Sequence, residues 1–489
     1  MAFIPRNRNS LRSLCLFYFA ILSCISAFSQ AEIGYSPSNY SGVQGLFLNP
    51  AKGCDSKMFL DVNLIGLDLF VHNNYVHYDK NQFYLWKNIN TGFPDLSFNS
   101  KTNSKTAQIA LNVTGPSVHL SVSNHSLGIF TRARSYTSAR IEKPLFTHIV
   151  EGFKYAPQLG QRYNLDNMYL NSLTWLEYGL SYGYIFHKKK YTMISAGANL
   201  RYLTGINSVG LDIENLDYEV VNNNLLEFYN YRGQIKQAAP ALGAGKGVGF
   251  DLGVEYKHML ADVSRYYPNS PLSGCRQIDY KWKAGASLLD VGFIRFNQNA
   301  SSESFNNVPS TWNDYDAIKI NSWDGLIDTI DVKFNPQGTI QTANKFAALL
   351  PMAVSAQFDY NFENNVYINA SAIFGPRIGS SVRRGGLLAV VPRYERKRFE
   401  LSLPVSLWDF RYPQIGFQLR LNNNFIIGSD RAMPFLFRSD VYGFDIYFHL
   451  KFSVYRNPAC KSGKKGKGKG GSKGRKKGGR GATDCPTYR

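Results

Sequence analysis

The stretch 442-YGFDIYFHLKFSV-454 decides the fold of this chain. Apolar or aromatic side chains occupy every second position from Tyr442 to Val454, and the positions between them hold Gly443, Asp445, Tyr447, His449, Lys451 and Ser453. Successive side chains of a β-strand point to opposite faces, so this period of two predicts a long strand with one apolar and one polar face. Strands of soluble proteins are typically about 5–6 residues long, whereas a tilted strand that crosses a membrane needs about 9–11.

The same alternation runs through residues 398–421. One face is apolar, with Phe399, Leu401 and Leu419 among its members, and the other face carries bulky charged and amide groups. Such a polar face suits the wet or plugged interior of a membrane barrel. The candidate lumen-lining residues are Arg398, Glu400, Gln418, Arg420, Asp445, His449 and Lys451. A soluble β-sandwich is the alternative, and Pro404 counts against a regular strand, because proline removes one ladder hydrogen bond.

The composition excludes a membrane protein built of several helices. The chain has 489 residues, of which 14% are aromatic and 18% charged, and its mean hydropathy is −0.26. Several spans of about 20 apolar residues each would give a more hydrophobic chain. The formal charge of +20 lies mainly at the ends, because residues 456–489 contribute +11 and the three arginines before Leu14 contribute +3. The remaining +6 gives the body no basic face for nucleic acid.

Residues 1–29 are predicted to be a cleaved signal peptide. Basic residues precede an apolar stretch from Leu14 to about Phe28, and small residues precede Gln30. A lipoprotein signal with an acylated Cys24 is the alternative. Export predicts a protein of the cell outer membrane. The expected division is the signal peptide 1–29, an N-terminal hatch or plug segment 30–56, a barrel 57–455 and a disordered Lys/Gly-rich periplasmic tail 456–489.

The expected fold is all-β, a transmembrane antiparallel up-and-down barrel of roughly 14–16 strands with an N-terminal hatch. About fifteen alternating runs can be counted, and a bacterial barrel has an even number of strands. Either a strand at Tyr75–Trp86 is missed, or the count is 14 and Phe425–Gly428 belongs to a loop. Tight turns fall on one side, and the long connections 136–174, 205–247 and 296–350 fall on the other. Residues 297–350 form an outer loop or fold back to constrict the lumen.

Several motifs together resemble an uncharacterised Bacteroidota family of outer-membrane β-barrels. They lie at residues 115–118, 128–135, 177–182, 200–205 and 285–292. The Asn49-Pro50-Ala51 segment before the first strand also resembles the N-terminal region of the long-chain fatty-acid transporter lineage and of type IX secretion outer-membrane subunits. The resemblance implies location and fold. It brings no substrate and no catalytic residues.

The search for reactive chemistry finds no catalytic, cofactor-binding or metal motif. The cysteines after the signal peptide are Cys54, Cys275, Cys460 and Cys485, with no CxxC spacing. Cys460 and Cys485 bracket the basic tail and form the candidate disulfide, because an oxidising compartment would let them close a charged loop. A Cys54–Cys275 bond requires both residues to lie at the periplasmic rim. No HExxH or GxSxG motif occurs, so an enzyme is not expected.

The predicted function is an outer-membrane β-barrel of structural, accessory or transport type with unknown cargo. One alternative is a passive channel or a porin for uptake of hydrophobic solutes, and another is an accessory subunit of a secretion or envelope-assembly machine. The expected partners are outer-membrane lipid and, through the basic tail, peptidoglycan or an envelope protein. No nucleic-acid partner and no cofactor are expected.

Overall fold

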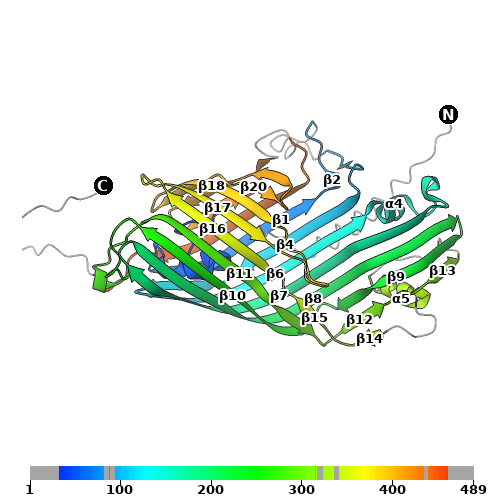
Figure 1. Cartoon of the computed structure of the whole chain (residues 1–489), viewed down its shortest axis with the longest axis horizontal. Helices are drawn as coiled ribbons and strands as arrows, with labels where there is room; N and C mark the ends of the chain where they lie inside the picture. The colour runs from blue at the N-terminus through cyan, green and yellow to red at the C-terminus, as the bar shows by residue number, and fades with distance from the viewer. Residues whose placement is uncertain are drawn as a thin grey trace, which may run out of the picture.

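The computed structural model describes residues 32–81, 88, 94–313, 315, 323–334, 341–433 and 439–460. The predicted signal peptide and Cys485 lie outside the described residues, as does the basic tail beyond Cys460. The described chain forms a barrel whose strands run obliquely along its length, with one end carrying tight turns and the other carrying long extensions (Figure 1). We call these the turn end and the crown end.

Fourteen staves close the barrel, all antiparallel to their neighbours, and pairing of the first with the last completes the cylinder. A stave is one strand or two collinear strands. In order they are β1 (Leu60–Asn73), β4 (Ser104–Thr114) with β5 (Ser117–Val122), β6 (His125–Glu142), β7 (Arg162–Lys189), β8 (Thr192–Asn222), β10 (Gly245–Met259), β11 (Tyr280–Phe296), β15 (Phe346–Leu349) with β16 (Ala353–Asn361), β17 (Val366–Phe374), β18 (Leu387–Glu395), β19 (Phe399–Ser402) with β20 (Val405–Trp408), β21 (Tyr412–Ile415) with β22 (Phe417–Leu421), β23 (Phe425–Ser429) and β24 (Gly443–Val454).

The predicted all-β membrane barrel is confirmed, and the odd strand count has a local cause. The runs 105–113 and 117–123 belong to one stave, because β4 and β5 both pair with β6 and are separated only at Gly115-Pro116. The alternative count of 14 is confirmed, but neither of the two runs singled out to correct the count is the cause of the odd number. Val76–His77 (β2) pairs with Ser97–Phe98 (β3) in a separate small sheet, and Phe425–Ser429 (β23) is a barrel strand. The second half of the Tyr75–Trp86 run, residues 82–86, lies outside the described residues.

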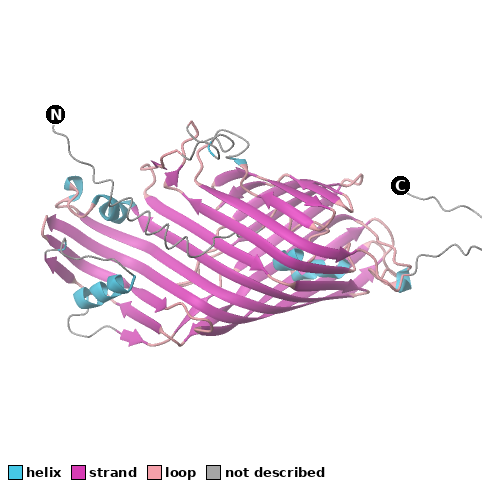
Figure 2. Cartoon of the chain, turned by 180° about the vertical axis from the view of Figure 1, so that it is seen from behind, coloured by secondary structure: helices cyan, strands magenta, loops and turns pink. Residues whose placement is uncertain are grey.

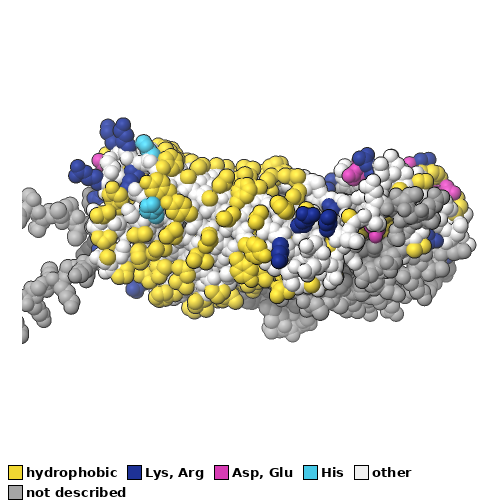
Figure 3. Space-filling view, turned by 90° about the horizontal axis from the view of Figure 1, so that it is seen from below, with side chains coloured by type: hydrophobic (Ala, Val, Ile, Leu, Met, Phe, Trp, Pro, Cys, Tyr) yellow, Lys and Arg dark blue, Asp and Glu magenta, His cyan; other side chains and the backbone are white. Residues whose placement is uncertain are grey.

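The outer surface of the barrel is apolar over a broad band (Figure 3). Leu180, Leu200 and Leu252 lie on three neighbouring staves, and each is about half exposed, at 58%, 62% and 48%. The alternate positions Ser181, Asn199 and Asp251 are buried inside the barrel. This is the reverse of a soluble globule and suits lipid outside with a polar interior. No helix among the described residues is long and apolar enough to cross a membrane.

The crown end is built largely from strands where irregular loops were predicted. β6, β7 and β8 continue past the apolar band, and β8 alone has 31 residues. We call the following elements the crown, together with the strand extensions that they cover: α4 (Lys143–Glu151), η2 (Ala156–Gln158), β9 (Leu225–Ala238), β12 (Ala300–Phe305), β13 (Ser310–Asn313), α5 (Trp323–Phe334) and β14 (Gln341–Ala343). An apolar cluster that includes Tyr218, Phe228 and Phe334 gives the crown its own core.

The turn end is closed by residues 260–279, which include η3 (Pro271–Ser273). This segment folds under the barrel with Val263, Tyr266 and Ile278 buried. A disulfide joins Cys275 to Cys460, with 6.0 Å between their Cα atoms. The candidate Cys460–Cys485 bond is therefore wrong in this structure, because the end of β24 brings Cys460 beside the 260–279 segment. Cys54 is free and buried in the lumen.

The first prediction concerns the apolar band. Leu252→Arg places a charge near the middle of the band, where it is expected to destabilise the barrel by about 2–4 kcal/mol. Leu242→Arg is the matched control, because Leu242 is 78% exposed beyond the band and the change there should stay within about 0.5 kcal/mol. Urea unfolding in lipid vesicles measures both, and equal losses would contradict the membrane placement.

The second prediction concerns the cysteines. Peptide mapping without reduction should recover a cross-linked peptide that contains Cys275 and Cys460. Cys485→Ser should keep this cross-link, and Cys275→Ser should abolish it. A peptide that links Cys460 to Cys485 in the unsubstituted protein would show that the described pairing is not the one formed on export.

Candidate functional site in the barrel lumen

The N-terminal segment 32–56 lies inside the barrel, and we call it the plug (Figure 2). It contains α2 (Val43–Leu48) and the 3-10 helix η1 (Pro50–Asp55). Pro50 suits the first position of a helical turn, because its fixed φ matches and its missing N–H would have no partner there. The Asn49 side chain accepts a hydrogen bond from the Ala51 N–H at 3.0 Å and caps this turn.

Three glycines make room for the plug at the barrel wall. Gly197 on β8, Gly253 on β10 and Gly285 on β11 lie on adjacent staves, and Gly197 pairs directly with Gly253. A Cβ atom at Gly197 would lie 2.5 Å from the carbonyl carbon of Pro50, which is closer than atoms can approach. Asn49 also donates a hydrogen bond to the Val254 carbonyl at 3.0 Å. The plug can therefore lie this close to the wall only because these three positions lack side chains, and we call the three glycines the glycine seat.

Polar contacts fix the orientation of the plug. Glu32 meets His449 at 2.7 Å, and the Ser38 hydroxyl donates to Glu400 at 2.6 Å. Lys451 donates to the Tyr40 carbonyl at 2.7 Å. Glu32, His449, Ser38, Glu400 and Lys451 are buried and Tyr40 is half-buried, so loss of one member would leave a buried polar group without water.

Six of the seven predicted lumen residues face the interior and are buried: Glu400, Gln418, Arg420, Asp445, His449 and Lys451. Arg420 pairs with Glu400 at 2.9 Å, and Ser402 donates to Gln418 at 2.8 Å. Arg398 does not line the lumen. It lies in the turn between β18 and β19, where the wall has ended and the side chain reaches water. Whether the other six line a transport pathway stays a prediction.

Residues 375–386 fold into the barrel from the crown end, and we call them the inward loop. They connect β17 and β18 but contact the far wall. The Arg383 N–H donates to the Ser138 hydroxyl on β6 at 3.0 Å, and the Ser380 hydroxyl donates to Gln234 on β9 at 3.3 Å. Arg377 pairs with Asp212 on β8. The sequence left residues 297–350 either to form an outer loop or to constrict the lumen. Their elements β12, β13, α5 and β14 lie in the crown, and a described segment that does cross the lumen is the inward loop.

A network of buried charges lies between the plug and the crown, and we call it the charge belt. Its members are Arg134, Glu177, Arg201, Asp251 and Asp290. Asp290 lies 2.6 Å from Arg134 and 2.6 Å from Arg201, and Arg134 lies 2.9 Å from Glu177. Arg201 also pairs with Asp251. Buried ions remain charged in such a setting only when opposite charges and hydrogen bonds surround them.

A bulge aims Asp290 into the belt. The register between β10 and β11 shifts after Phe250, and Asp290 has a positive φ of 55°. Leu289 and Asp290 are consecutive yet both buried, which the period of two does not allow. The sequence analysis missed the belt for this reason. Its one local signal was the break in alternation at Leu288-Leu289-Asp290.

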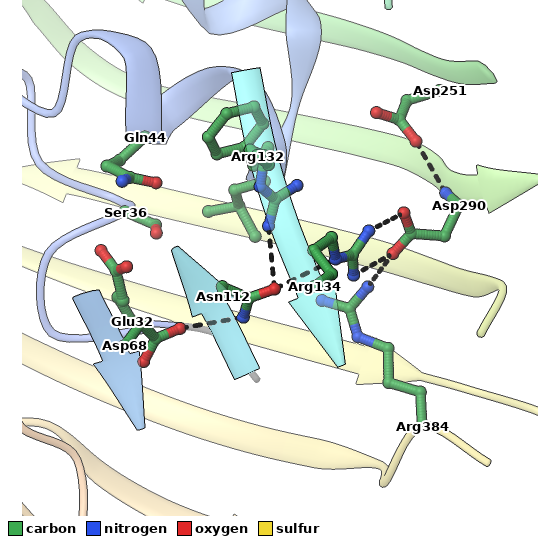
Figure 4. A pocket seen from close by; sticks show the side chains of 12 residues that line it. Glu32, Ser36, Gln44, Asp68, Asn112, Arg132, Arg134, Asp251, Asp290 and Arg384 are labelled. Carbon is green, nitrogen blue, oxygen red and sulfur yellow. Dashed lines mark hydrogen bonds and ion pairs between the residues drawn. The ribbon is translucent and has the colours of Figure 1, made fainter. Parts of the chain in front are cut away.

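The plug, the wall and the inward loop meet around a small chamber of about 40 Å³ (Figure 4). The plug supplies Glu32, Ser36, Gln44, Phe47 and Leu48; the wall supplies Asp68, Asn112, Arg132, Arg134, Asp251 and Asp290; the inward loop supplies Arg384. Arg134 and Arg384 both point at Asp290, and Arg384 contacts it at 3.0 Å. A buried water needs about 10–15 Å³ of such space, so the chamber holds a few waters and no larger solute.

Two further places in the described part of the chain gather charged or ligand-type groups. In the plug, burial and nearby Lys283 hold the pKa of Lys52 well below its usual range, and its amine donates to the carbonyls of Ser36 and Ser38. At the crown end, His77, Asp79 and Asp440 place ligand atoms within 4.8 Å of one another. They are the described residues whose spacing could hold a metal ion, and the sequence analysis expected none.

The third prediction tests the charge belt. Asp290→Asn removes the carboxylate shared by Arg134, Arg201 and Arg384, so the free energy of unfolding should fall by about 3–5 kcal/mol. Asp217→Asn is the control, because Asp217 pairs with Arg162 on the solvent-exposed crown and should cost less than about 1 kcal/mol. Denaturant titration of the detergent-solubilised barrel measures both, and similar losses would contradict a structural role for the belt.

The comparisons with solved structures find proteins of low similarity, among them two toluene transporters. The toluene transporter TbuX of Ralstonia pickettii is 9% identical, with a TM-score of 0.39 over 88% of this chain and 98% of that chain. The toluene transporter TodX of P. putida is 10% identical, with a TM-score of 0.36 over 84% and 92%. A Pseudomonas aeruginosa FadL homologue is 9% identical, with a TM-score of 0.31 over 88% and 99%. These values carry no argument about cargo.

No curated protein matches the chain significantly. A family model matches residues 50–430, from η1 of the plug to the residue after β23. The match covers most of the chain and includes every motif on which the resemblance to an uncharacterised barrel family rested. The predicted bacterial phylum stays a prediction. The protein belongs to the family of unknown function DUF5723.

Proposed function

We propose that this protein is a gated transport barrel of the outer membrane whose resting lumen is closed by the plug and the inward loop. The observation that carries the proposal is the chamber between them. The plug and the inward loop are two separate chain segments that meet the wall there through hydrogen bonds and ion pairs. Such contacts can be exchanged for contacts with water at a net cost of about 0.5–1.5 kcal/mol for a neutral hydrogen bond and about 1.5–3 kcal/mol for one to a charged group.

The geometry supports movement of the plug more than movement of the wall. The wall is a closed hydrogen-bonded cylinder, whereas η1 is seated beside Gly197 and Gly253. The plug is joined to the wall where the chain continues into β1, and its helices α2 and η1 are short. Release of η1 from the glycine seat and of Glu32 from His449 would connect the chamber to the turn end.

The lining of the chamber favours a small hydrophilic cargo. The chamber is lined by the guanidinium groups of Arg132, Arg134 and Arg384 and by the carboxylates of Asp68, Asp251 and Asp290. A hydrophobic solute would have to strip water from these charges without replacing it, which is costly. The alternative of hydrophobic-solute uptake is therefore less favoured by this site. The protein acts without catalysis in this proposal.

The proposed outer-membrane location rests on two observations and one prediction from the sequence. The apolar band surrounds a closed antiparallel barrel, and this architecture satisfies every backbone group without an open edge. The Cys275–Cys460 bond suits an oxidising compartment. The predicted signal peptide 1–29 supplies the route of export. In this placement the turn end faces the periplasm and the crown faces outward.

A second candidate function is an accessory barrel within an envelope machine, and the crown favours it. Strands β7 and β8 extend far beyond the apolar band, and α4 and α5 pack against an apolar core there. The basic tail begins beside Cys460 and is tethered through the disulfide to residues 260–279. Its charge suits peptidoglycan or an acidic envelope protein.

The fourth prediction separates the two functions. Gly197→Val places a branched side chain where Pro50 lies, so it should unseat η1 and raise the conductance of the barrel in planar bilayers at least tenfold over the nearly silent unsubstituted protein. Ala198→Val is the matched control, because the neighbouring side chain points to lipid and should leave the conductance unchanged. Heat-modifiable migration on gels confirms that each variant is folded. A folded Gly197→Val barrel that stays silent would reject plug gating and favour the accessory role.

A further inference from the structure

Three basic side chains form a row on the outer surface of the barrel, and we call them the basic row. They are Lys246 on β10, Arg295 on β11 and Lys345 just before β15. Lys246 pairs directly with Arg295 across the two strands. Arg295 pairs with Ala347, so Lys345 lies two residues along the next stave on the same face. All three residues are exposed.

The basic row lacks partners within the described part of the chain. No acidic side chain there forms an ion pair with Lys246, Arg295 or Lys345, and none of the three side chains donates a hydrogen bond. Some other surface cations are paired, such as Arg162 with Asp217 and Lys281 with Glu363. Three neighbouring like charges repel one another, so the row is costly unless an anion neutralises it.

The basic row lies at the crown-side border of the apolar band. Next to the basic row, on its turn-end side, the outward residues are apolar or aromatic. They are Tyr202, Val248, Phe293 and Leu349, which pair with one another across four neighbouring staves. Beyond them toward the turn end lie Leu200 and Phe250. In Figure 3 a group of Lys and Arg side chains lies at the border between the hydrophobic band and the crown. The basic row is thus at headgroup level, and Tyr202 occupies the position expected of an interfacial aromatic residue.

We propose that the basic row binds the phosphate groups of a phosphorylated glycolipid of the outer leaflet, the lipid A portion of lipopolysaccharide. The crown side of the band faces outward in the proposed placement, so outer-leaflet headgroups lie at this level. Arg295 offers a guanidinium fork that fits phosphate with two hydrogen bonds, and the two lysines add point charges on either side. The apolar row beneath receives the acyl chains. Both parts of the lipid therefore meet complementary chemistry on one surface.

This inference rests on the outer-membrane placement and not on gating by the plug. A barrel that never conducts would still bind the lipid, and a gated barrel without the lipid site would still conduct. The two proposals fail separately.

The test measures lipid bound to the detergent-solubilised, folded full-length protein by native mass spectrometry. The probes are bisphosphorylated lipid A, the same lipid with both phosphates removed, and inorganic phosphate. The variant K246Q/R295Q/K345Q should bind bisphosphorylated lipid A at least tenfold more weakly than the unsubstituted protein. The control K189Q/K190Q/R276Q removes three exposed charges at the turn end and should bind normally.

Each possible result of this experiment supports or overturns the binding of lipid A by the basic row. Retention of lipid A by the basic-row variant, or equal binding of dephosphorylated lipid A by the unsubstituted protein, would overturn the proposal. Equal weakening in the control variant would show a general charge effect and would also overturn it. Binding of inorganic phosphate as tight as that of lipid A would assign the row to a free anion instead. Both variants must show the heat-modifiable migration of a folded barrel, and the conservative variant K246R/R295K/K345R should restore most of the binding.

Discussion

The pairing of β1 with β24 is the interaction on which the rest of the structure depends. Lipid offers no partner to a backbone N–H or C=O group, so a sheet that crosses a membrane must have no open edge. Residues Leu60 to His72 meet Gly443 to Val454 in antiparallel register and remove that edge. Closure then gives every inward side chain a confined interior and every outward one a lipid surface. The alternating side chains of each strand are thereby divided between the polar interior and the lipid.

A closed interior creates the second requirement, which is that its polar side chains must find partners. The plug and the inward loop meet this requirement with the residues that also obstruct the lumen. Glu32, Ser38 and Asn39 of the plug bind His449, Glu400 and Glu395 of the wall, and Arg384 of the inward loop adds a guanidinium to Asp290 in the charge belt. Stability and closure therefore come from the same contacts. A protein built in this way can open only by exchanging those contacts for water or cargo.

The two ends of the barrel serve different purposes. At the turn end, residues 260–279 fold under the wall, Tyr266 donates a hydrogen bond to Asp55 of the plug at 3.0 Å, and a disulfide ties the loop to the end of β24. At the crown end, long strands carry an apolar core of their own above the membrane band. The turn end therefore holds the plug, and the crown offers the surface that meets the outside.

The sequence by itself determined the all-β class, the membrane placement and the face on which Glu400, Gln418, Arg420, Asp445, His449 and Lys451 lie, because a period of two is written into neighbouring residues. It could not place Arg398, since alternation does not say where the wall ends and a turn begins. It could not pair Cys460 with Cys275 or bring the inward loop across to Asp290, because those contacts join residues that are distant along the chain. The bulge at Asp290 shows the same limit, because the local pattern points that side chain outward. Only closure of the barrel around a plug brings these groups together, and there the need to neutralise buried charge decides which residues meet.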